Sequence, residues 1–175
     1  ERSYPHTTAV VVRGLKVAQQ NDLALVPGVL ERGIEWLVQY QNGQLIELKN
    51  AESKTVPYKP QPDNLDALIF HILSDCGRPD IEMQNMLYEK RQSLSVYGLS
   101  LLALGTHQSG NAEQTAMLRR NIEQFLVEDG ENETAFLRST SPWWYWYGSE
   151  IEGTAAYLKL LTKVEPKGRI AARVV

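Results

Sequence analysis

The chain has little that could cross-link it, span a membrane or attract nucleic acid. Cys76 is the single cysteine in 175 residues, so a disulfide within the chain is excluded. No run of roughly eighteen apolar residues occurs, which excludes a transmembrane helix. Eighteen basic residues stand against 21 acidic ones, with no basic cluster, so we expect no nucleic-acid partner and no direct membrane contact. The composition, 43% hydrophobic and 22% charged, is typical of one globular domain.

Apolar residues recur at helical spacing in four segments, over residues 7–20, 63–76, 95–105 and 150–163. A more polar helix is predicted after each of the first three, over residues 26–41, 81–91 and 112–128. On the first helix, the apolar face is expected to hold Val10, Val11, Gly14, Leu15 and Ala18. The alternation of apolar and polar helices is typical of stacked helical hairpins, in which each hairpin needs neighbours to bury its apolar face.

Two longer segments interrupt the helical pattern, residues 42–62 with the turn signal Asn42-Gly43, and residues 130–148. Both are long for plain loops, so short strands or an ordered loop are expected. Residues 167–175 begin a further helix of barely two turns, and the chain starts without Met or a signal peptide. We therefore expect a domain truncated at both ends, with an apolar patch exposed on its terminal face.

Three of the four tryptophans lie in one aromatic run, Trp143-Trp144-Tyr145-Trp146-Tyr147. Successive side chains of an extended segment point to opposite faces, so another surface must cover some of them. Trp143, Trp144, Trp146 and Tyr147 are candidate contact residues, because such aromatics anchor interfaces and stack on sugars or peptides. Alternatively they seal a loop over the helices. Burying half of their area, at about 25 cal/mol per Å², would stabilise that loop by several kcal/mol.

The three histidines are distant in sequence, but helices could bring them together. The alternative places His6 at a helix start, His71 in or beside a core helix and His107 in a turn. None of them has a cysteine or carboxylate at the spacing of a metal site, so this structural interpretation is favoured.

The acidic residues also allow two interpretations. Asp63, Asp66 and Asp75 could form a metal or acid cluster, or Asp63 could start a helix that ends near Asp75. Glu150 and Glu152 could be paired catalytic carboxylates. They could equally serve a helix that Ser149 caps, with Glu152 as its capping-box partner.

Three segments together resemble the thioester-containing domain of alpha-2-macroglobulins and complement proteins. They are residues 149–161 (SEIEGTAAYLKLL), 95–105 (SVYGLSLLALG) and 7–15 (TTAVVVRGL). The Trp-rich approach to Glu150 and residues 87–91 (LYEKR) are most similar to the bacterial alpha-2-macroglobulins. The resemblance extends in order over nearly the whole chain.

The resemblance implies an all-α fold, an α/α toroid in which inner and outer helices alternate over about six hairpins. This chain would be an incomplete toroid of about four middle-to-late hairpins, forming one partial domain over residues 1–175. A short irregular or β-hairpin loop would carry the Trp run. The location implied is periplasmic or extracellular.

The family traps attacking proteases through a thioester formed within a Cys-x-Glu-Gln motif, which this chain lacks. Cys76 is followed by Gly-Arg-Pro, and the nearest match, Asn111-Ala112-Glu113-Gln114, has an amide that forms no thioester. Asn111 is instead a good helix N-cap. The resemblance thus implies a scaffold segment of a protease inhibitor, with no catalysis, metal or cofactor. Its partners would be neighbouring domains and, through the parent protein, target proteases.

Two alternatives stay open. The chain could be a helical-repeat binding module that uses the loop at residues 143–147. It could also be an α/α-toroid enzyme, for example one that processes polysaccharides or cyclises terpenoids. Such an enzyme needs acids that converge in the hole, and the sequence contains no Asp-rich motif or carboxylate pair of that kind.

Overall fold

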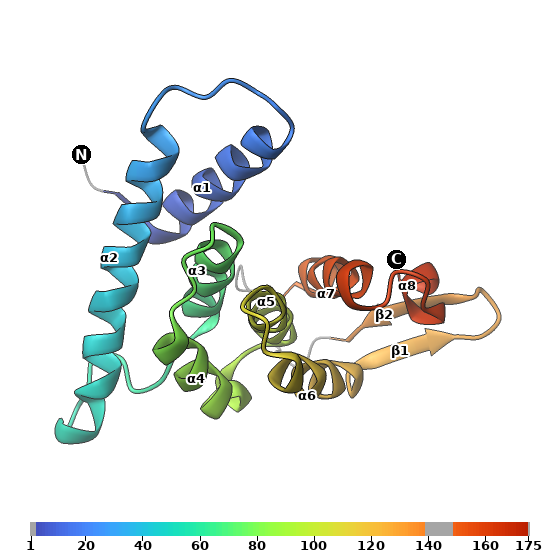
Figure 1. The fold of residues 1–175 in the computed structure, drawn as a ribbon. Coiled ribbons are helices and arrows are strands. Elements are labelled where there is room, and N and C mark those ends of the chain that lie inside the picture. The colour runs from blue at the N-terminus through green and yellow to red at the C-terminus, as the bar shows by residue number, and fades with distance from the viewer. Residues whose placement is uncertain (1–2, 139–148, 175) are drawn as a thin grey trace.

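The computed structural model describes residues 3–138 and 149–174 (Figure 1). The described chain is mostly helical, as the all-α prediction required, with one small antiparallel hairpin. The helices are α1 (Pro5–Gln20), α2 (Val29–Lys49), α3 (Asn64–Asp75), α4 (Ile81–Glu89), α5 (Val96–Gln108), α6 (Ala112–Glu123), α7 (Glu150–Val164) and α8 (Arg169–Arg173). Two 3₁₀ turns, η1 (Ala51–Ser53) and η2 (Arg91–Ser93), and two strands, β1 (Leu126–Asp129) and β2 (Thr134–Leu137), complete the described elements.

Polar N-caps define where five of the helices begin, α4 among them, where Asp80 accepts a hydrogen bond from the Met83 amide. Asp63 accepts hydrogen bonds from the first-turn amides of α3 and forms a capping box with Asp66. Ser95, Asn111 and Ser149 cap α5, α6 and α7 through their side-chain oxygens. The predicted caps Asp63, Asn111 and Ser149 are therefore confirmed. Each cap satisfies an amide that would otherwise have no partner at the helix start.

The helices α3, α5 and α7 pack side by side, and α2, α4 and α6 lie on their flanks (Figure 1). Most side chains of α3 and α5 are buried, since each is covered on several sides. Glycines allow the close approach: a methyl group on Gly105 would lie 2.4 Å from the Phe70 ring, and one on Gly153 would lie 3.7 Å from the backbone of Tyr97. The predicted helices over residues 63–76, 95–105 and 150–163 are confirmed within a few residues at each end.

The helix predicted over residues 26–41 is longer at its C-terminal end. It begins after Gly28, whose φ of +75° favours glycine, and it continues to Lys49. The predicted Asn42-Gly43 turn is wrong, because both residues lie inside α2. The buried stripe Leu37, Gln41, Leu45 and Leu48 continues at helical spacing, and burial of that stripe outweighs the local turn preference.

The helix predicted over residues 112–128 ends at Glu123, and residues 126–137 form the β-hairpin. The hairpin turn is closed by Asp129, whose carboxylate accepts hydrogen bonds from the amides of Glu131 and Asn132. Ala135 and Leu137 are buried against α7, so packing stabilises an extended conformation here. A β-hairpin was expected to carry the Trp run. The observed one precedes that run, and Trp143, Trp144, Trp146 and Tyr147 lie outside the described residues.

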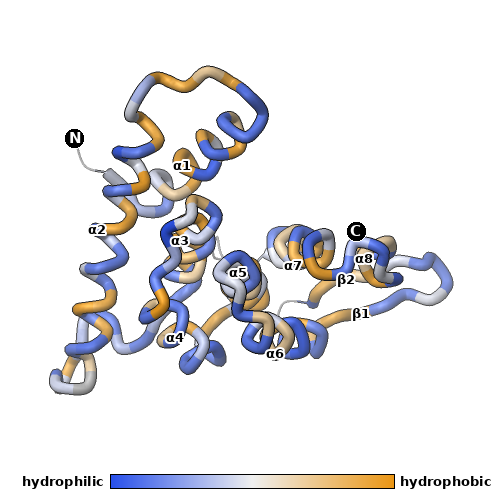
Figure 2. Tube along the Cα trace, in the orientation of Figure 1, coloured by the Kyte–Doolittle hydropathy of each residue, from blue (hydrophilic) through white to orange (hydrophobic). Residues whose placement is uncertain are grey.

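The apolar face predicted for the first helix is only in part the buried one, because Leu15 and Ala18 are half-buried but Gly14 is exposed. Val10 and Val11 are about half exposed, at 51% and 52%, whereas Ala9 and Val12 are buried. The connection from α1 to α2 is also apolar and exposed, with Leu23 and Val26 open to solvent (Figure 2). At the other end, the expected apolar patch is not on α8: Ile170 and Ala171 are half-buried, and Val174 is buried in a parallel bridge to Ala135.

Candidate functional site

A cavity of about 200 Å³ opens where α1, α3, α5 and α7 meet. Its apolar wall comes from two leucines of α5 and two alanines of α7, Leu101, Leu104, Ala155 and Ala156. Its polar groups are Arg13 of α1, His71 of α3, Tyr97 of α5, and Glu152 and Lys159 of α7. Four helices that are distant in sequence thus contribute chemistry to one small space.

His71 is 1% exposed, and its Nε2 lies 3.2 Å from the Nζ of Lys159. Because an ammonium group can only donate, Nε2 must accept, which places the ring proton on Nδ1. This Nδ1 is buried and has no hydrogen-bond partner within the part of the chain that is described. Burial, together with the charges of Lys159, Arg13 and Lys163, lowers the pKa of His71 to about 3. The imidazole is therefore neutral at physiological pH.

Lys159 is half-buried and forms no ion pair among the described residues. Burial lowers the pKa of its amine, and Arg13 lowers it as well, while Asp75 raises it. Arg13 is likewise without a carboxylate partner in the described ranges. Excess positive charge consequently surrounds the cavity, offset on its wall by the carboxylate of Glu152.

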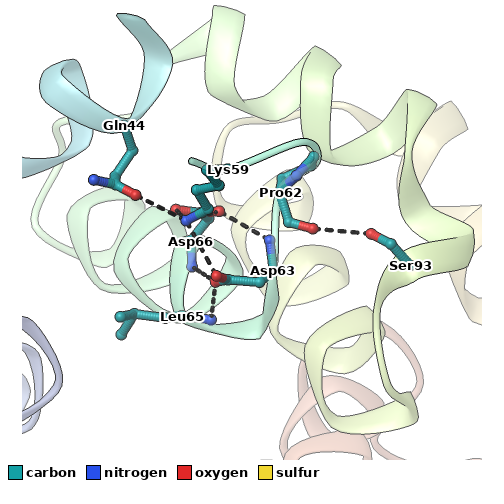
Figure 3. A network of polar contacts seen from close by, with 7 residues as sticks. All are labelled: Gln44, Lys59, Pro62, Asp63, Leu65, Asp66 and Ser93. Carbon is teal, nitrogen blue, oxygen red and sulfur yellow. Dashed lines mark hydrogen bonds and ion pairs between the residues drawn. The ribbon is translucent and has the colours of Figure 1, made fainter. Parts of the chain in front are cut away.

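A second polar cluster is buried near the start of α3, where it holds the proline-rich segment against the helices (Figure 3). The Nζ of Lys59 lies 2.8 and 2.7 Å from the two carboxylate oxygens of Asp66 and 3.1 Å from Asp63. The amide oxygen of Gln44, from α2, accepts a further hydrogen bond at 2.9 Å. All these polar groups are satisfied by one another, which identifies the cluster as structural.

A third polar chain links α6 to α7. The Tyr157 hydroxyl donates to Glu123 at 3.1 Å, and Arg119 bridges Glu123 and Glu165 at 2.7 and 2.5 Å. Burial raises the pKa of Tyr157, and the negative charge of Glu123 raises it further. The phenol therefore stays protonated and serves as a hydrogen-bond donor.

Two larger hollows offer less chemistry. One of about 420 Å³ lies beside α6, where Arg91 donates to Asn121 and to the carbonyl of Tyr88 and stacks over the Tyr88 ring. Another, of about 500 Å³, is lined by three prolines of the segment before α3 and by residues at the ends of α2 and α4. In the first hollow the cation already has its partners, so the small cavity at Lys159 is the more reactive environment.

Most of the candidates named from sequence lie apart, although His71 and Glu152 line the same cavity. His6 lies in the first turn of α1, His71 in the core of α3, and His107 in the last turn of α5 rather than in the predicted turn. Asp63 and Asp66 meet on Lys59, and Asp75 ends α3. Within residues 3–138 and 149–174, no three His, Cys, Asp or Glu side chains are grouped so as to hold a metal ion.

Of the paired glutamates, Glu152 lines the cavity and also serves the cap of α7. Its backbone amide donates to the Ser149 hydroxyl at 3.4 Å, which is one of the two hydrogen bonds of the predicted capping box. Sequence reasoning missed Arg13 and Lys159. Each is a lone cation inside an apolar run, VVVRGL and YLKLL, and that interruption was the available signal.

None of the described helices combines the length and apolarity needed to cross a bilayer. Comparison with protein-family models, with curated proteins and with solved structures finds no match for this chain.

Proposed function

We propose that this chain is a scaffold segment of an α/α toroid in an alpha-2-macroglobulin-like protease inhibitor, without catalytic activity of its own. The observation that carries the proposal is the position of the motif residues. Most residues of the α5 motif and about half of those of the α7 motif are buried where these two helices pack side by side, whereas the α1 motif buries Ala9 and Val12.

The α7 motif illustrates this correspondence. Gly153, Thr154, Tyr157, Leu160 and Leu161 are all buried. Gly153 lies against the backbone of α5, and the Thr154 hydroxyl accepts a hydrogen bond from the Leu137 amide at 3.1 Å. The motif therefore consists of contacts between α7 and its neighbours, which is what a scaffold role requires.

The arrangement of layers also supports a toroid. Alternate helices α3, α5 and α7 form one row, and the intervening helices flank it, as inner and outer helices of a ring would. The outward side of α1 exposes Val10, Val11 and Val17, and α7 exposes Ile151. In a ring of this kind, further hairpins would cover these apolar side chains.

The polar clusters favour a structural role over catalysis. The carboxylates Asp66 and Glu123 are engaged by Lys59 and by Arg119 with Tyr157. Glycoside hydrolysis would need two carboxyl groups facing one cleft. Among the described residues that line the small cavity, Glu152 is the single acid.

The open reading frame that encodes this chain tests the proposal directly. We expect helical hairpins on either side that complete a ring, and β-sandwich domains beyond them. A reading frame that instead joins this segment to an unrelated catalytic domain would refute the assignment.

A biochemical test concerns the isolated chain, with an intact alpha-2-macroglobulin as the positive control. We expect no covalent uptake of labelled methylamine and no slowing of protease action on large substrates. Uptake, or inhibition of several unrelated proteases, would contradict a purely scaffolding role.

A further inference from the structure

We propose that the cavity between α1, α3, α5 and α7 binds a carboxylate group, held by the Lys159 ammonium and the Arg13 guanidinium. The site is independent of the proposed scaffold function, because it depends on groups within this chain alone. It would place an acidic ligand between the first and last of the four helices.

The first support is unbalanced charge. Several cations of the described chain have carboxylate partners, as Lys49 has in Glu82 at 2.7 Å and Lys59 has in Asp66 at 2.7 Å. Arg13 and Lys159 face the same cavity and have no such partner among the described residues. Charge held together without a counter-ion costs free energy, and an anion between the two groups would relieve it.

The second support is the orphan donor of His71. Since Lys159 donates to Nε2, the Nδ1–H of His71 is a buried donor without an acceptor in the described structure. Buried donors nearly always have partners, so an exception of this kind calls for an explanation such as an ordered water or an ion. His71 thus holds the Lys159 ammonium at the wall of the cavity.

Size and lining select the kind of anion. A volume of about 200 Å³ is smaller than the roughly 300–1,000 Å³ of sites for drug-sized ligands, so it suits a group the size of a side chain. Leu101, Leu104 and Ala155 offer an apolar surface for a short aliphatic stem. The positive charge of Arg13 and Lys159 attracts any anion, but phosphate has no aliphatic part to cover this apolar wall. A short aliphatic acid, or a Glu or Asp side chain of a peptide, matches all three features.

The test is an NMR titration of the full chain at constant pH and ionic strength, with the His71 ring signals as the local probe. The ligands are propionate, its neutral isostere propionamide, inorganic phosphate, and a blocked tripeptide with a central glutamate or glutamine. We expect saturable shifts with propionate in the millimolar range, and none with propionamide or with the glutamine peptide. Phosphate is expected to bind more weakly than propionate.

Variants separate a specific site from general charge. Lys159→Gln and Arg13→Gln should each weaken propionate binding about tenfold, the effect of losing one charge-assisted hydrogen bond. Lys159→Arg should keep most of the affinity. Lys163→Gln is the matched control, because Lys163 is a nearby cation on α7 that does not line the cavity. Circular dichroism and thermal unfolding verify that each variant is folded, and the exposed Arg13 is the safer substitution if Lys159→Gln unfolds.

The outcomes divide cleanly. Tighter binding of the glutamate peptide than of propionate would support the site and identify a polypeptide as the source of the carboxylate, whereas equal affinity would support a free acid. No saturable shift, equal shifts with propionamide, or equal loss in Lys163→Gln and Lys159→Gln would overturn the proposal. None of these results depends on whether the parent protein is a protease inhibitor.

Discussion

The Lys59→Met substitution should destabilise the protein strongly, because it leaves a buried carboxylate without its cation. Asp66 is 2% exposed, and Lys59 contacts both of its oxygens, at 2.8 and 2.7 Å. After the substitution, the Asp63 amide, at 2.9 Å, is the donor that still faces the Asp66 carboxylate. Breaking one side of a buried pair costs about 3–5 kcal/mol. We expect about 3 kcal/mol here, the low end of that range, because Asp66 can take up a proton instead.

The loss should depend on pH in a defined direction. Burial raises the pKa of Asp66 and the charge of Asp63 raises it further, whereas Lys59 lowers it. Removing Lys59 therefore moves the folded-state pKa still higher above the ordinary value of 3.8. At pH values between the ordinary pKa of the unfolded chain and the raised pKa of the folded state, the folded state holds the proton more tightly, so stability falls as pH rises. The deficit of Lys59→Met should be larger at neutral pH than near pH 4.

Urea denaturation followed by circular dichroism at neutral and acid pH measures both effects. In thermal unfolding, the same loss of 3 kcal/mol corresponds to a drop of roughly 6–12 °C in the melting temperature of a chain of this size. The double variant Lys59→Met/Asp66→Asn should recover most of the stability, since no buried charge remains. Lys54→Met is the matched control, because the exposed Lys54–Glu47 pair, at 3.1 Å, contributes about 1 kcal/mol or less. If Lys59→Met costs no more than that control, or if the double variant is less stable than the single one, the reasoning is wrong.

Three further substitutions test packing, hydrogen bonding and titration. Gly105→Ala should lower the free energy of unfolding by about 1–3 kcal/mol, because the added methyl group overpacks the core. Thermal unfolding measures this loss. Gly43→Ala is the control, because open space surrounds the position of its Cβ, and it should not destabilise the protein. Thr154→Val removes the hydroxyl that accepts a hydrogen bond from the Leu137 amide. Hydrogen exchange at that amide should become faster, corresponding to about 1–3 kcal/mol of lost protection. Unchanged exchange would refute the role of this hydrogen bond. Stability should fall as pH drops from 6.5 towards 3, since the unfolded chain binds a proton that native His71 resists. His71→Leu should flatten that slope in acid titrations followed by circular dichroism, and an unchanged slope would contradict the assignment.

Helix positions could be predicted from sequence where local signals agreed with burial. Asp63, Asn111 and Ser149 are capping residues that precede apolar periodicity, and each does begin a helix. Prediction failed where tertiary packing overrode local preference. Asn42 and Gly43 favour a turn, yet the stripe through Leu45 continues α2 past them.

The candidate site was not predictable in the same way. Its groups come from four helices, and no spacing along the chain relates Arg13 to His71 or to Lys159. The sequence did contain a hint, since both cations interrupt apolar runs. That hint carries no information on which partners face each cation, because partner identity depends on how helices pack across long separations.

By itself, the sequence determined the helical character of the chain, the main caps and the apolar segments that became α3, α5 and α7. These are local properties, set by periodicity and by hydrogen bonds between residues three or four positions apart. The tertiary structure alone decided that Ala9 and Val12, rather than Val10 and Val11, face the core. It also decided that residues 126–137 form a hairpin, and that Lys159 reaches His71. Those outcomes depend on which surfaces are available to cover a given face, and the folded arrangement of distant segments supplies them.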